Sequence, residues 1–343
     1  MSLRRSFRNL AYFFVLVIIL NFYSQNSAIA DELTDAQNLL TLLGIAPEQV
    51  DQLERGEALS FDVTEKGDKE LAVGLAMYVR TTPAKIGSLV KAGHLESIDA
   101  DIIAYGYLPE NAKVVDFNEL IFGKKQEKEA ESFLQAQPGS RFNLSSEEYQ
   151  FLRDAENNHN DQTEAAAHQY RNLLLKRLQS YKREGLKGIA PYDRDGNKSD
   201  PASALREFAI SNGVLAQFFP DLYNAWLNYP ADLPKDTEEK YLWFNLTVED
   251  RPTPILTHRI MRTAPEGLVI LARQFYVGHS YDASQLTIGC FPYREGAILF
   301  YARRMSTDRV AGVASGLKHS IGRVQMRSEM RKRMQLLKQD ALS

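Results

Sequence analysis

The stretch that decides the fold is GLVILARQFYV, residues 267–277. Alternate positions of this segment are apolar on both sides, with Leu268 and Ile270 on one face and Val269 and Leu271 on the other. A strand with one face in water alternates apolar and polar residues. We therefore expect this strand to be covered by other elements on both faces, or to line a cavity with one of them.

Three neighbouring segments have the length and apolar content of further strands. They are PILTHRIMR (254–262), QLTIGCF (285–291) and AILFYARR (297–304). The short turn sequences TAPEG and PYREG connect the first and last pairs, as in β-hairpins. The last hundred residues are therefore predicted to form an antiparallel meander.

A long helix is predicted to follow the meander from about Thr307 or Asp308 to the C-terminus. Its packing stripe is expected to consist of apolar residues three or four positions apart, namely Val310, Val313, Leu317, Ile321 and Val324, with Met330, Met334 and Leu337 as a looser continuation. Glycines destabilise a helix interior by up to about 1 kcal/mol each relative to alanine. Gly312, Gly316 and Gly322 therefore suggest a close approach to the sheet, or space left for something else.

The N-terminal part of the chain contains two more predicted strands joined by a turn, at 57–63 and 69–80. A helix follows at 82–93, where Thr82 and Pro83 give a typical helix start, and then a strand at 100–108. From about residue 124 the sequence becomes polar and helical, and its clearest helix is 163–185. We expect residues 124–240 to form a helical insertion.

The first thirty residues have the features of a cleaved export signal. Arg4, Arg5 and Arg8 precede an apolar run, and Ala28 and Ala30 precede Asp31 as a cleavage site. Because these residues carry three arginines and no acids, their removal moves the net charge from −3 to −6. An acidic chain is a poor partner for nucleic acid. The sequence predicts a periplasmic protein that does not bind nucleic acid.

The order of the elements resembles the START-like, or helix-grip, fold, in which a curved antiparallel sheet wraps a C-terminal helix around a cavity. The similarity covers residues 45–110 and 241–340. It implies an α+β fold with a START-like sheet built from 31–123 and 241–343, a long C-terminal helix and a large helical insertion at 124–240. The segments LTHRIMR (256–262), RQFYVGHSYDASQLTIG (273–289) and YARRMSTDRVAG (301–312) also resemble a family of exported bacterial proteins with no assigned function.

Polar residues crowd the end of the central strand. Arg273 lies among apolar positions and would need a carboxylate or several acceptors, because an unpaired buried charge is costly. Gly278 permits a bend, after which His279 and Asp282 follow. These residues could form a structural corner, a ligand-binding rim or a histidine–aspartate acid/base pair. The candidate ligand-binding set is Arg273, Tyr276, His279, Tyr281, Asp282, His258 and Arg303.

No metal or cofactor is expected from the sequence. If the first hairpin centres on Pro265, His258 lies opposite about Ala272, too far along the sheet from His279 to share an ion. Motifs for zinc, phosphate or activated-serine chemistry are lacking. The one cysteine, Cys290, lies in an apolar run and is expected to be a buried, inert thiol.

The sequence favours a periplasmic binding protein for a hydrophobic or amphipathic small molecule, with lipid as one candidate. Two alternatives stay open: a cofactor-independent enzyme that uses His279 and Asp282, and an envelope protein-interaction factor that uses the helical insertion. The basic residues of the last helix form either a solvated face or a peripheral contact with anionic membrane.

Overall fold

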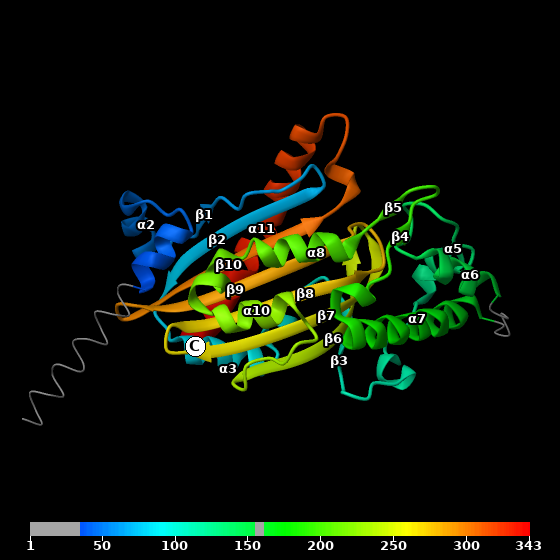
Figure 1. The fold of residues 1–343 in the computed structure, drawn as a ribbon, viewed down its shortest axis with the longest axis horizontal. Helices are drawn as coiled ribbons and strands as arrows, with labels where there is room; N and C mark the ends of the chain where they lie inside the picture. Colours follow the sequence, from blue (N-terminus) through cyan, green and yellow to red (C-terminus); the bar gives the residue numbers. More distant parts are fainter. Residues whose placement is uncertain (1–34, 155–160) are drawn as a thin grey trace, which may run out of the picture.

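The computed structural model describes residues 35–154 and 161–343, so the predicted export signal lies outside the described residues. The chain forms an α+β fold around an eight-stranded antiparallel sheet (Figure 1). Its strand order is β1-β2-β10-β9-β8-β7-β6-β3. The strands are β1 (Leu59–Phe61), β2 (Glu70–Val79), β3 (Ile102–Leu108), β6 (Thr237–Val248), β7 (Arg251–Ala264), β8 (Gly267–Val277), β9 (Ala283–Tyr293) and β10 (Gly296–Ser306).

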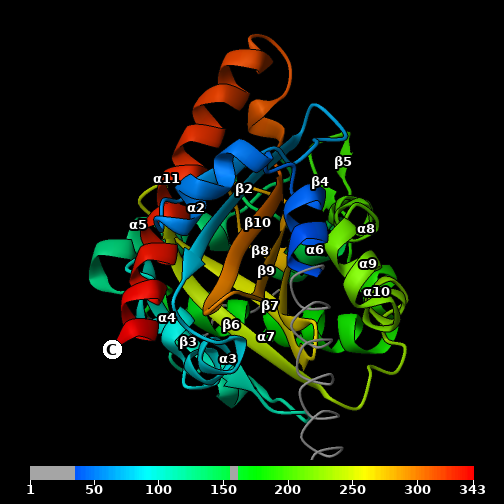
Figure 2. The same cartoon turned by 90° about the vertical axis from the view of Figure 1, so that its left-hand side faces the viewer.

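Helices cover the sheet on both faces. Figure 2 shows α11 on one side of the sheet and α8, α9 and α10 on the other. The small hairpin of β4 (Tyr192–Asp193) and β5 (Lys198–Ser199) belongs to the second side. The helices are α2 (Val50–Glu54), α3 (Pro83–Lys91), α4 (His94–Ser97), α5 (Glu127–Leu134), α6 (Ser146–Asp154), α7 (Gln162–Glu184), α8 (Pro201–Ile210), α9 (Gly213–Phe218), α10 (Pro220–Leu227) and α11 (Ser315–Leu342).

The central strand β8 is buried on both faces, as its sequence predicts. Leu268 and Ile270 pack in a core with α3 and α11. Val269 and Leu271 pack in a second core with α8, α9 and α10. A third core joins α5, α6 and α7 to β3 and β6.

The predicted strands and the hairpin turns are confirmed, but two details differ. Strand β6 was not predicted, although the run YLWFNLTV within it is typical of a strand. The β7–β8 register also differs by one residue, so that His258 pairs with Arg273 rather than about Ala272. The reason is the turn, in which two residues separate Ala264 from Gly267.

A bulge at Phe275 of β8, opposite the step from Leu256 to Thr257 of β7, changes the face that the end of β8 presents. Simple alternation places Tyr276 on the same face as Leu268 and Ile270. In the structure Tyr276 packs with Phe275 in the core of α5, α6 and α7. The prediction was wrong for Tyr276, because alternation cannot show an inserted residue.

The C-terminal helix α11 begins later than predicted. A short 3-10 turn spans Asp308–Val310, and Gly312 and Ala314 both have left-handed backbone angles, with φ of 75° and 59°. Left-handed residues interrupt a helix. The regular helix therefore starts at Ser315.

The packing stripe of α11 was predicted wrongly in its first half only. The buried row is Met326, Met330, Met334, Leu337 and Ala341, which packs on the sheet and includes the predicted continuation of the stripe. Val310, in the 3-10 turn, is buried as well, whereas Val313, Leu317, Ile321 and Val324 are exposed. Apolar residues have helical spacing in both halves, so periodicity alone could not show which of them pack.

Replacement of Met334 by alanine tests which row packs. Met334 is completely buried, and we expect M334A to lower the free energy of unfolding by about 2–5 kcal/mol, because a buried methionine leaves a cavity. Leu317→Ala is the matched control and should change it by less than about 0.5 kcal/mol. Urea denaturation of both variants measures the difference, and a larger loss in L317A would contradict the assignment.

Candidate functional site

A cavity of about 950 Å³ lies between the sheet and α11. Its floor comes from β6, β7, β8, β9 and β10, and its other walls come from α4 and α11. Its mouth lies between exposed lining residues on two sides. One side has Thr247 and Asp250 near the β6–β7 turn, and the other has Ile321 and Gln325 on α11.

The walls of the cavity are largely apolar. Alternate residues of the strands point into it, because side chains of a strand alternate between faces. The apolar lining residues include Leu71, Leu242, Phe244, Leu246, Ile270, Ala272, Leu286, Ile288, Met305, Met326 and Met330. Ala272 is partly exposed although it lies at the centre of the sheet, because it faces the cavity.

Three arginines from the sheet and α11 line the cavity, and two of them have acidic partners. Arg259 Nη1 lies 2.5 Å from Glu96 Oε1, and Arg333 Nη2 lies 2.9 Å from Asp99 Oδ1. Arg303 donates from Nε to Ser284 Oγ at 3.1 Å and has no ion pair within the described residues. Its guanidinium is therefore left without a compensating charge.

Two uncharged polar atoms of the cavity lining have no hydrogen-bond partner among the described residues. They are the hydroxyl oxygens of Thr257 and Tyr301, both on buried side chains. Burial raises the pKa of Tyr301 well above its usual range, so this group stays a hydroxyl that can donate. Buried polar groups normally have a partner, and these two are available to a ligand.

Tyr281 and Arg303 are the sequence-predicted site residues that line this cavity. Tyr281 donates from its hydroxyl to Gln274 Oε1 at 2.8 Å, and Gln274 lines the cavity as well. Burial raises the pKa of Tyr281, although the nearby charge of Arg303 opposes the shift.

Arg273 lies on the opposite face of the sheet, away from the cavity. It is fully buried and donates to the Tyr181 hydroxyl at 3.0 Å and to the Trp226 carbonyl at 3.1 Å. Its guanidinium also stacks 3.9 Å from the centre of a Trp226 ring. The sequence predicted a carboxylate or several acceptors, and the structure supplies acceptors and an aromatic face.

His258 extends this network, also on the far side from the cavity. Its Nδ1 lies 2.9 Å from the Tyr181 hydroxyl. Because that hydroxyl already accepts a hydrogen bond from Arg273, we assign it as the donor to His258 Nδ1. The neutral imidazole then carries its own proton on Nε2. Nε2 lies 2.9 Å from Glu239 Oε1, out of line for a hydrogen bond. Burial lowers the pKa of His258 to about 4, outweighing the attraction of Glu239.

Tyr276 is likewise turned toward the helical layer. The guanidinium of Arg177 in α7 lies 4.4 Å from the centre of its ring. Arg177 is held by two short hydrogen bonds to Glu148. Tyr276 therefore joins α7 to the sheet and does not reach the cavity.

His279 is buried just after the end of β8, and both of its ring nitrogens contact polar groups of the chain. Its Nε2 lies 3.0 Å from Thr253 Oγ1 and 3.1 Å from the Pro252 carbonyl oxygen, and its Nδ1 lies 2.7 Å from Ser280 Oγ. Burial lowers its pKa to about 3, and the charge of Arg251 adds to the shift.

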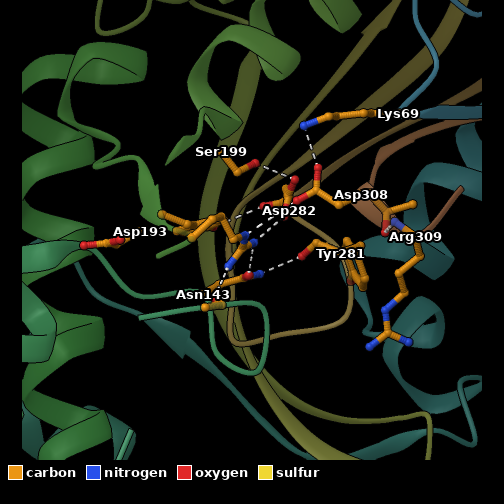
Figure 3. Close-up of polar contacts among 12 residues, drawn as sticks. Lys69, Asn143, Asp193, Ser199, Tyr281, Asp282, Asp308 and Arg309 are labelled. Carbon is orange, nitrogen blue, oxygen red and sulfur yellow. Dashed lines mark hydrogen bonds and ion pairs between the residues drawn. The ribbon is translucent and has the colours of Figure 1, made fainter. Parts of the chain in front are cut away.

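Asp282 forms a polar corner with partners from the helical insertion (Figure 3). It accepts from Arg194 at 2.8 Å and from Ser199 at 2.6 Å. Asn143 donates to the carbonyl of the neighbouring Tyr281, and Lys69 pairs with Asp308 beside it. Burial raises the pKa of Asp282 above its usual range, against the opposing effects of Ser199 and Arg194. The corner ties the insertion to the sheet.

His279 and Asp282 therefore have separate sets of partners, and no hydrogen bond joins them. The acid/base hypothesis required such a contact, so the geometry gives it no support. Within residues 35–154 and 161–343, no cluster of three or more histidine, cysteine, aspartate or glutamate side chains is arranged to hold a metal. Cys290 is buried, which raises its pKa to about 12, as expected for an inert thiol.

Sequence reasoning missed most of the polar residues of the cavity. Tyr301 stands two positions before Arg303 on β10 and so shares its face, which was a usable signal. Ser284 and Gln274 carry no such signal, because small and amide side chains occur in many strands. Arg333 comes from a helix whose orientation the sequence did not determine.

No protein-family model matches this chain, and no curated protein is significantly similar to it in sequence. The resemblance to a family of exported proteins stays an expectation from the sequence.

The buried histidines His258 and His279 predict a loss of stability in mild acid. Their folded pKa values, about 4 for His258 and about 3 for His279, lie below the ordinary value of 6.5. As pH falls below 6.5, the unfolded chain takes up these protons first, so each histidine lowers the free energy of unfolding by about 1.4 kcal/mol per pH unit. This contribution is complete above pH 6.5 and is lost progressively toward pH 4.

Urea denaturation between about pH 7.5 and pH 4.5 measures this slope. The variant His279→Gln should remove roughly half of the pH dependence of the free energy of unfolding that the two histidines cause. Ile255→Val is a buried control that cannot titrate; it should lower stability by about 0.5–1.5 kcal/mol and keep the slope. An unchanged slope in H279Q would contradict the assignment.

Proposed function

We propose that the protein binds an amphipathic small molecule, of the lipid class, in the cavity between the sheet and α11. The observation that carries this proposal is the combination of largely apolar walls with one uncompensated guanidinium, that of Arg303. The volume of about 950 Å³ lies at the upper end of the range for small-molecule sites.

The apolar part of the lining and the part around Arg303 would hold the two ends of the ligand. An acyl chain or similar apolar part would lie along Ile270, Leu286 and Met330, where each buried methylene contributes about 0.8 kcal/mol. An anionic group would lie at Arg303, within reach of the Tyr301 hydroxyl. Charge-assisted hydrogen bonds of this kind are about twice as strong as neutral ones.

A helix-grip arrangement fits this proposal. The methionines of α11 pack on the sheet along its second half, and Gly322 lies over Leu71 at the cavity wall. Methionine side chains adapt to ligands of different shape. In this proposal α11 holds the ligand against the sheet, as the closing helix does in START-like domains.

The competing hypotheses have less support. An enzyme based on His279 and Asp282 lacks the contact between them. An interaction factor would expose a large apolar patch on the insertion, yet in the described part of 124–240 Ile210 is the one large apolar side chain that is exposed. We place the binding activity in the periplasm, on the strength of the export signal expected at 1–30.

Native mass spectrometry of the protein isolated from its own cells tests the proposal. We expect a co-purifying adduct of lipid size. Ala272→Phe should abolish it, because the new ring fills the centre of the cavity, and Arg303→Gln should reduce the bound fraction at least about tenfold, since one charge-assisted contact is lost.

Arg206→Gln, on the exposed face of α8, is the matched control and should keep the adduct. Circular dichroism verifies that each variant folds. A wild-type protein that carries no adduct and binds no added fatty acid would refute the proposal.

A further inference from the structure

The first half of α11 and the turn before it carry an apolar surface that nothing in the described chain covers. Val313 is 91% exposed, Leu317 65%, Ile321 53% and Val324 62%. Single exposed apolar residues are common, but four that form one surface are a sign of an interaction site. This end of the helix extends beyond the strands of the sheet (Figure 1).

Leu317, Ile321 and Val324 lie on one face of α11, at spacings of four and three residues, and Val313 lies in the turn just before the helix. This face points away from the buried row of Met326, Met330 and Met334, so the two rows serve different neighbours. We call the surface of Val313, Leu317, Ile321 and Val324 the apolar tip.

The chain segment that carries the apolar tip is rich in cations. Residues 309–328 contain Arg309, Lys318, Arg323 and Arg327 and no acidic residue. Arg309 and Arg323 have acidic partners from other segments, whereas Lys318 donates to a backbone carbonyl and Arg327 Nε has no partner among the described residues.

Two further cations follow the apolar tip along the helix. Arg331 and Lys332 are exposed and form no ion pair in the part of the chain that the structure describes. Arg331 is seven positions after Val324, about 10 Å along a helix. That distance is comparable with the depth of about 5–10 Å to which the apolar face of an amphipathic helix enters the head-group boundary.

We propose that the apolar tip docks on an anionic lipid bilayer. The tip enters the boundary between head groups and acyl chains, while Lys318, Arg327, Arg331 and Lys332 meet the phosphates. Amphipathic helices bind membranes by this combination of buried apolar area and attraction to anionic lipid. In the described residues no helix has the length and apolar character to span a bilayer, so the contact is peripheral.

A second copy of the chain fits this surface less well. A symmetric dimer would bring the same patch of both copies together, and the cations beside one tip would face those of the other. Like charges across an interface disfavour association. An anionic surface is the complementary occupant.

The apolar tip is also next to the mouth of the cavity. Ile321 belongs to both, and Gly322 and Gln325 line the cavity beside it. Docking therefore turns the mouth toward the bilayer. The proposal stands without a bound ligand, because it depends on the exposed face of the helix alone.

Vesicle flotation tests the proposal with the purified protein. Vesicles of phosphatidylcholine with phosphatidylglycerol should bind at least about tenfold more protein than vesicles of phosphatidylcholine alone, and added salt should weaken the binding. The double variant Leu317→Ser/Val324→Ser should bind at least about tenfold less than wild type. Both positions are exposed and outside the cavity, so folding and ligand binding should persist.

The matched control is Val115→Ser/Ile121→Ser, which removes two equally exposed apolar side chains elsewhere and should keep vesicle binding. The charge variant Arg331→Gln/Lys332→Gln should lose the preference for anionic vesicles. The cavity variant Arg303→Gln should float like wild type. This result would distinguish membrane docking from the proposed binding of a ligand in the cavity.

Three outcomes would overturn the proposal. The first is wild-type protein that does not float with anionic vesicles, and the second is a tip variant that floats as well as wild type. The third is a wild-type dimer in light scattering that the tip variant converts to monomer, which would make this face an interface between copies of the chain.

Discussion

The structure depends on the burial of β8 on both faces. A strand with apolar residues on each side leaves the sheet unstable until two layers cover it. The chain supplies one layer from its middle, through α7 to α10, and the other through α3 and the C-terminal helix α11. The second layer has fewer helices than the first and does not fill the whole face of the sheet. The space that it leaves between α11 and strands β6 to β10 is the cavity.

This asymmetry separates two groups of buried polar residues. Arg273, His258 and Tyr181 are joined by hydrogen bonds inside the helical layer, where Trp226 adds an aromatic face, although Arg273 Nε and His258 Nε2 have no partner among the described residues. A network with its bonds mostly made rigidifies a core. On the other face of the same sheet, Arg303 and Tyr301 keep unused hydrogen-bonding capacity. The binding site differs from the structural network because its unpaired polar groups line a cavity that a ligand can enter.

The last helix has two roles along its length. Its second half contributes Met330 and Met334 to the core beneath the sheet. Its first half exposes Leu317 and Val324 and carries cations without acids. The left-handed residues Gly312 and Ala314 set where the helix begins. The proposals for ligand and membrane meet at this helix, since Ile321 belongs to both surfaces.

The sequence by itself determined the α+β class, β8 and its neighbouring strands, their hairpins and a long terminal helix, because alternation, turn residues and helical spacing are local properties. It also placed Arg303 and Tyr281 among the candidate residues. Tertiary structure alone decided the side of the sheet that Tyr276 faces, through a bulge, and the row of α11 that packs, since both rows had helical spacing. It also decided that His279 and Asp282 have separate partners. Those partners, Thr253 for one and Arg194 and Ser199 for the other, lie far away in the sequence, and no local pattern encodes a contact between distant segments.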